Sequence, residues 1–171
     1  MLLEFFNSLF VYLRMKKLLY LFMILLFTAC TPNYTKHEAS LIVFKTPTMA
    51  FADAGFIHHN GEALKIVILV VGQPVFTLEL GRKICLDGSC LSKEKFIHKR
   101  LSPYYPRDIL QNIFLGKPIF ASLNLVKSAG GFKQRLYKED AYDIYYSVDD
   151  GQIRFKDKLA KVLIKSKKII Q

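Results

Sequence analysis

The stretch LKIVILVVGQPVFTLEL, residues 64–80, decides the fold class of this chain. Its first part, 64–71, is a run rich in Ile and Val, which is typical of a strand buried on both faces. Three residues that favour a turn then interrupt the run: Gly72, Gln73 and Pro74. In the second part, polar residues alternate with three apolar ones: Phe76, Leu78 and Leu80. The pattern predicts two strands joined by a short loop, the second strand with one apolar face.

Strand patterns continue on both sides of this pair. Apolar runs predict strands at 40–45, 49–58, 83–86 and 89–91, and a weaker strand or extended segment at 94–101. Further strands are predicted at 132–137, 142–148, 153–155 and 159–170. Strands and helices do not alternate, so we expect an antiparallel sheet. The prediction is a mainly β fold with a minor α component, in which a curved or partly closed sheet of about ten strands lies under one helix.

The single predicted helix lies within PRDILQNIFLG, residues 106–116. Pro106 is favoured in a first helical turn, and Gly116 is favoured just after a helix ends. The residues at helical spacing on one face are apolar: Ile109, Leu110, Ile113 and Phe114. We expect this face to cover one opening of the sheet.

The N-terminal segment MKKLLYLFMILLFTAC, residues 15–30, has the layout of an export signal. Its lysines precede an apolar run that is shorter than the ~20 residues needed to span a bilayer. The block FTAC, residues 27–30, resembles the lipobox of bacterial lipoproteins, although Phe27 stands where Leu is more usual. An uncleaved anchor helix and a plain secretory signal are the alternatives.

The lipobox resemblance implies a domain organisation. Residues 1–29 would be a signal peptide, with Met15 as a candidate for the true start. Cys30 would receive a diacylglyceryl group, and residues 30–40 would form a lipidated tether to a membrane. Thr31 follows Cys30 in place of the Asp that retains such proteins in the inner membrane, which favours the periplasmic face of the outer membrane.

The net charge of the chain and the motifs that it lacks restrict the possible functions. The formal net charge of +11 would suit nucleic acid, anionic lipid headgroups or an acidic partner. Export removes nucleic acid as a partner, so we expect the lysines near the C-terminus to face headgroups or solvent. No nucleophile elbow, phosphate-binding loop or zinc motif is found, so the chain is not expected to be an enzyme or to bind a cofactor. His58 and His59 are adjacent beside a turn signal and would chelate a metal poorly.

Two cysteines remain after Cys30. If Asp87 and Gly88 form a two-residue hairpin turn, Cys85 faces Cys90 across the strands with Cα atoms ~4.5 Å apart. This separation is within the range of a disulfide, and a compartment beyond the inner membrane permits the bond. Two free thiols are the alternative.

The stretch 64–119 resembles LolB, the family of outer-membrane lipoprotein receptors. The resemblance rests on the apolar strand, the Pro/Gly loop, the strand ending in LEL and the Pro-led helix ending in LGKP. It implies an open antiparallel half-barrel over residues 41–171, with an apolar cavity for acyl chains such as palmitate. The candidate lining residues are Phe76, Leu78, Leu80, Ile109, Leu110, Ile113 and Phe114. The implied partners are acylated lipoproteins and the periplasmic carrier that delivers them.

The chain departs from the LolB pattern in its candidate insertion loop. Members of the family carry a protruding Leu there, which inserts cargo into the membrane, whereas Gln73 is the aligned residue here, between Gly72 and Pro74. Val70 and Val71 are close by in a run expected to be buried. The chain also lacks Trp. A lipoprotein with a closed core that acts through protein contacts is therefore kept as an alternative function.

Overall fold

The computed structural model describes residues 14–17, 35–61 and 63–169. The chain divides into two compact units, Met1–Asn33 and Tyr34–Gln171. Residues 14–17 are helical, while Cys30 and most of the predicted signal peptide lie outside the described residues. Among the described helices, none has the length and apolar character needed to cross a membrane.

The second unit is built on one open antiparallel sheet of 11 strands. The strands are β1 (Lys36–Lys45), β2 (Ala50–His59), β3 (Leu64–Val70), β4 (Gln73–Leu80), β5 (Lys83–Leu86), β6 (Ser89–Ser92), β7 (Leu125–Ser128), β8 (Gly131–Lys138), β9 (Tyr142–Asp149), β10 (Gln152–Asp157) and β11 (Val162–Lys168). Their order in the sheet is β6-β5-β4-β3-β2-β1-β11-β10-β9-β8-β7. Strands that follow one another in the chain are therefore neighbours in the sheet, except β6 and β7, which form its two edges, and the two halves of the sheet meet where β1 pairs with β11. The predicted mainly β fold with an open antiparallel sheet is confirmed.

Strand β1 begins earlier than predicted. Lys36 already pairs with His59 of β2, so residues 36–40 belong to the sheet and not to the tether. On the other side of β1, Ser40 pairs with Lys168 of β11.

Two α-helices, α2 (Lys93–Arg100) and α3 (Ile109–Phe114), and a short 3-10 helix, η1 (Phe120–Ser122), connect β6 to β7. The segment at α2 was predicted to be extended, and this prediction is wrong. Ser92 caps the helix by accepting a hydrogen bond from the backbone N–H of Lys95 at 3.3 Å. Glu94 in the first turn and basic residues in the last turn, from His98 to Arg100, suit the helix dipole. Helix α3 starts three residues after Pro106, so it is shorter than predicted, and its apolar face is buried as expected.

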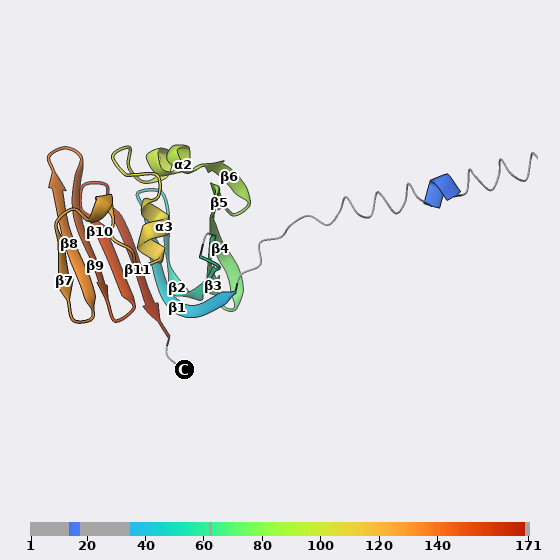
Figure 1. Ribbon diagram of the computed structural model, residues 1–171, viewed down its shortest axis with the longest axis horizontal. Coiled ribbons are helices and arrows are strands. Elements are labelled where there is room, and N and C mark those ends of the chain that lie inside the picture. The colour runs from blue at the N-terminus through green and yellow to red at the C-terminus, as the bar shows by residue number, and fades with distance from the viewer. Residues whose placement is uncertain (1–13, 18–34, 62, 170–171) are drawn as a thin grey trace, which may run out of the picture. The chain divides into compact units, whose positions relative to one another are not determined.

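The sheet has a buried face and an outer face. Along β3, buried residues alternate with half-buried ones, so the expectation that this strand is buried on both faces is wrong. The reason is that no second layer of the described residues covers the outer side, where Lys65 pairs with Glu79 at 3.0 Å. In Figure 1 the sheet curls so that β7–β10 and β3–β6 lie on opposite sides of α3.

The core lies inside this curl, between the sheet and the two helices. It contains alternate residues of β1–β5 and β8–β11 together with the apolar residues of α2 and α3. Gly55 allows β2 to lie close to β3, because a Cβ atom at this position would collide with the carbonyl oxygen of Val67. Among the described residues, the buried apolar ones all belong to the unit Tyr34–Gln171. This unit therefore has its complete sheet and core and is expected to fold by itself.

Candidate functional site

The seven residues predicted to line an acyl-chain cavity are brought together in the structure. Phe76, Leu78 and Leu80 lie on the buried face of β4, and Ile109, Leu110, Ile113 and Phe114 lie on α3. All belong to the core cluster, and none is more than 5% exposed. With α2 and α3 in these positions, core side chains occupy the inside of the curl, so an acyl chain could enter only if the helices moved.

Residues 93–119, which we call the helical cover, are held together by a charged contact. Lys93 at the start of α2 donates hydrogen bonds to Asp108 at 2.7 Å and to Gln111 at 2.8 Å. The hydrogen bond from Lys93 holds the pKa of the Asp108 carboxyl below its ordinary value. The contact fixes α2 relative to α3, so we expect the cover to move as one piece.

Polar contacts join the helical cover to the C-terminal half of the sheet. The hydroxyl of Tyr105 donates to Asp157 at 2.6 Å, where β10 ends, and both residues are buried. Burial, followed by the hydrogen bond to Asp157, raises the pKa of Tyr105 well above its ordinary value. The hydroxyl of Tyr146 on β9 donates to the carbonyl of Lys117 at 3.0 Å.

The end of the cover is fixed by a buried amide. The Gln134 side chain on β8 accepts from the backbone N–H of Ile119 at 2.9 Å and donates to its carbonyl at 3.0 Å. It also donates to the carbonyl of Leu123 at 2.8 Å. The cover is thus attached by directional bonds to β8–β10, while apolar side chains fill the space between α3 and β4.

The candidate insertion loop forms the tip of the β3–β4 hairpin. Because Val70 pairs with Gln73, the turn consists of Val71 and Gly72, one residue earlier than the predicted loop. Both have positive φ, 50° and 77°, as a type I′ turn requires. The side chain of Val71 is 96% exposed, and its neighbours Val70 and Val75 are 43% and 41% exposed. The expectation that the valines at 70 and 71 are buried is therefore wrong, and the tip is apolar.

The two cysteines of the β5–β6 hairpin form a disulfide. Cys85 pairs with Cys90 across the hairpin and Leu86 pairs with Ser89, which is the predicted register. The bond closes a short hairpin at one edge of the sheet. Its neighbour α2 begins directly after β6, so the disulfide fixes the strand from which the helical cover starts.

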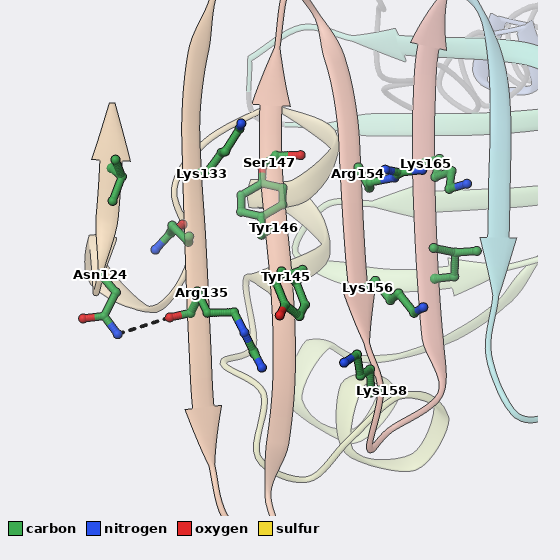
Figure 2. A pocket seen from close by; sticks show the side chains of 13 residues that line it. Asn124, Lys133, Arg135, Tyr145, Tyr146, Ser147, Arg154, Lys156, Lys158 and Lys165 are labelled. Atoms are coloured by element: carbon green, nitrogen blue, oxygen red, sulfur yellow. Dashed lines mark hydrogen bonds between the residues drawn. The ribbon is translucent and has the colours of Figure 1, made fainter. Parts of the chain in front are cut away.

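A broad groove lies on the outer face of the sheet, on the opposite side from the core. Its volume is about 1020 Å³, and side chains from the segment 124–165 line it. Figure 2 shows these side chains on β7–β11 and the adjoining turns, with basic residues prominent among them: Lys133, Arg135, Arg154, Lys156, Lys158 and Lys165. A second hollow of about 410 Å³ shares Ser147, Arg154 and Lys165 with the first, so the two lie side by side.

An aromatic ring lies among these cations. Tyr145 is 47% exposed, and the guanidinium carbon of Arg135 lies 3.9 Å from its ring centre. The Nζ atom of Lys158 is 5.4 Å from the same centre. Arg135 and Lys158 both form ion pairs with Asp143. Sequence patterns did not single out this groove, although the alternation of Arg154 and Lys156 with buried residues along β10 carried the signal.

Other predicted features have different outcomes. Cys30, the candidate lipidation site, lies outside the described residues. His58 is on β2 and contacts His37 of β1. Burial, followed by the charges of His37 and Lys65, lowers the pKa of His58. Among residues 14–17, 35–61 and 63–169, no group of three or more His, Cys, Asp or Glu side chains could hold a metal ion.

Comparisons with known proteins add no relative. A scan against models of protein families gives no match, and a search of the curated proteins finds no similar sequence.

Proposed function

We propose that this protein is a lipid-anchored receptor of the outer membrane that resembles LolB. It takes up the acyl chains of lipoproteins between its sheet and its helical cover, and releases them into the membrane. Cys30 would carry the anchor, and a periplasmic carrier would deliver the cargo. The main support is the exposed apolar tip of the β3–β4 hairpin. Members of the LolB family carry a protruding Leu in this loop, and Gln73 is the residue that aligns with it here. Val71 supplies an exposed apolar side chain in the same loop.

Val71 is held at the tip at a cost in stability. A β-branched residue with positive φ is unfavourable by ~1–2 kcal/mol, and type I′ turns prefer Asn at this position. The side chain has no compensating burial, since it is 96% exposed. Contact with an apolar environment, such as the acyl region of a bilayer, would give this side chain a favourable partner.

The interior of the curl has the composition needed for acyl chains. The buried surface is apolar along β3 and β4, where it faces the helical cover. The hydrogen bonds between the cover and the sheet involve β8–β10, where Tyr105 bonds to Asp157 and the backbone of Ile119 bonds to Gln134. If the cover swings about its end at Gln134, α3 separates from β4 and the bond from Tyr105 to Asp157 breaks, while the bonds of Gln134 remain. Acyl chains would then replace contacts between apolar side chains.

The first test is native mass spectrometry of residues 34–171 with a synthetic diacylated peptide, and with the same peptide unacylated. The proposal expects a complex with the acylated peptide only. An empty domain that ignores acylated peptide would refute the receptor function. It would favour the alternative of an accessory envelope lipoprotein with a closed core, and the next experiment would be a search for a protein partner.

A second test separates uptake from release. Val71→Asn removes the apolar side chain and suits the type I′ turn, so the variant should be more stable by ~1 kcal/mol. It should still bind the diacylated peptide but transfer it to vesicles more slowly. Leu123→Asn is the matched control, because Leu123 is an exposed apolar residue outside the hairpin tip. Equal transfer rates for the two variants would refute the role of the tip.

A further inference from the structure

The basic residues of the outer-face groove are arranged in rows that the strand register defines. In one row Lys133 pairs with Ser147, Ser147 pairs with Arg154, and Arg154 pairs with Lys165. The row crosses β8, β9, β10 and β11, with strands ~4.8 Å apart. Ser147 has the smallest side chain of the row, and Figure 2 shows it between Lys133 and Arg154.

The pairing of Arg154 with Lys165 is unfavourable in the isolated protein. Like charges directly opposite each other on one face of a sheet destabilise it. At the other end of the groove, the negative charge of Asp143 offsets the positive charges of Arg135 and Lys158. Within the described part of the chain, no ion pair is found for Lys133, Arg154 or Lys165. An anion above Ser147 would supply the missing negative charge.

Apolar groups lie next to the cations. The neighbouring row holds Tyr145 and Leu163, which pair with Lys156 on its two sides. The cationic row itself ends in Val126 on β7 and Val43 on β1. Tyrosine with flanking Lys and Arg is typical of protein surfaces at a membrane interface. The groove therefore suits an anion that carries apolar groups more than a wholly polar anion.

We propose that the outer-face groove binds the headgroup of an anionic phospholipid at a membrane surface. The phosphate lies over Ser147, accepts from its hydroxyl, and is flanked by Lys133 and Arg154, with Lys165 adding further charge. The glycerol and the first methylene groups contact Tyr145 and Leu163. This site lies on the opposite face of the sheet from the acyl-chain interior, so it goes beyond the proposed function and does not depend on it.

The test is vesicle flotation of residues 34–171, which lack Cys30 and its anchor. Vesicles of phosphatidylcholine alone should bind weakly, and vesicles that also contain phosphatidylglycerol should bind well. The double variant R154Q/K165Q should weaken the phosphatidylglycerol-dependent partition about 30-fold, which corresponds to ~1 kcal/mol for each lost charge. Its midpoint of thermal unfolding should rise, because the repulsion between the two side chains is removed.

Two further variants distinguish a defined site from diffuse charge. The double variant K83Q/K138Q makes the same change in net charge at exposed lysines outside the groove, and binding should stay unchanged. Ser147→Leu keeps every charge but fills the centre of the row, and binding should be lost. Equal weakening by both double variants, or full binding by Ser147→Leu, would overturn the proposal.

Competition experiments identify the ligand. Short-chain phosphatidylglycerol should displace the protein from the vesicles, while inorganic phosphate at the same concentration should not. Displacement by inorganic phosphate would overturn the proposal in favour of a simple anion site. Displacement by polyglutamate as effective as that by the lipid would overturn it in favour of an acidic protein partner.

Discussion

Replacing Tyr105 by Phe tests how firmly the helical cover is attached. The change removes one hydroxyl, which donates a hydrogen bond to Asp157 at 2.6 Å. It leaves the aromatic ring in edge contact with Phe155, with 5.9 Å between the two ring centres. Asp157 keeps the backbone N–H donors of Asp143, Leu159 and Ala160 on its other oxygen. The loss is therefore one hydrogen bond to a buried charged group.

A hydrogen bond of this kind contributes ~1.5–3 kcal/mol. We expect Tyr105→Phe to lower the free energy of unfolding by about 2 kcal/mol, and the midpoint of thermal unfolding by about 8 °C. Circular dichroism during urea and thermal unfolding measures both quantities. Tyr104→Phe is the control, since Tyr104 is 51% exposed, and it should leave both unchanged.

The same variant makes a prediction about binding. If acyl chains enter only when the cover moves, a weaker attachment lowers the cost of the open state. The affinity for a diacylated peptide should then increase by up to ~30-fold, the equivalent of the lost 2 kcal/mol. A variant that is as stable as the parent would refute the energetic argument for the contact. A destabilised variant with unchanged affinity would refute the requirement for cover movement.

Three further predictions concern stability. Burial raises the pKa of Tyr146, and burial with the Asp157 contact raises that of Tyr105, so the folded state keeps these protons when the unfolded chain loses them. The free energy of unfolding should thus fall above about pH 10, by ~1 kcal/mol per tyrosine between pH 10 and 11, in urea titrations. Replacing Cys85 and Cys90 by Ser should cost about 2 kcal/mol, because the disulfide closes a short loop. Gly55→Ala should cost about 2 kcal/mol in the same assay, because its Cβ would collide with β3.

Each of these predictions has an internal control. In Tyr105→Phe the fall in the free energy of unfolding above pH 10 should be smaller than in the parent protein. Reductant should lower the stability of the parent but not that of the double Ser variant. Gly81→Ala should be neutral, because no heavy atom lies closer than 4.0 Å to the added Cβ. A decline above pH 10 that persists unchanged in Tyr105→Phe would show that Tyr105 does not titrate differently in the folded state.

The strands were predictable from the sequence because alternation directly reports a sheet with one buried face. Residues 142–148 and 76–80 follow this pattern closely. Helix α2 was not predictable in this way, since its buried residues Phe96 and Ile97 are adjacent and fit neither a strand pattern nor an apolar helical stripe. The cap at Ser92 and the charges at the two ends determine this helix, and these signals are weaker.

The site was less predictable than the fold. The exposed tip at Val71 lies at the end of an apolar run, so composition alone assigns it to the core. Its exposure follows from the register, which places the turn at Val71 and Gly72 instead of at Gly72–Pro74. The row from Lys133 to Lys165 depends on pairings between four strands, which no local pattern contains.

The pairing of β1 with β11 has a consequence for how the chain reaches its folded state. Strand β1 is the first of the unit to be synthesised and β11 is the last, yet they are neighbours in the middle of the sheet. Until β11 has emerged, β1 and β10 are both unpaired edges, and the two halves of the sheet are held together only through the cover. Contacts between such distant segments form slowly. The sheet can therefore be completed only after β11, the last strand of the unit, has been synthesised.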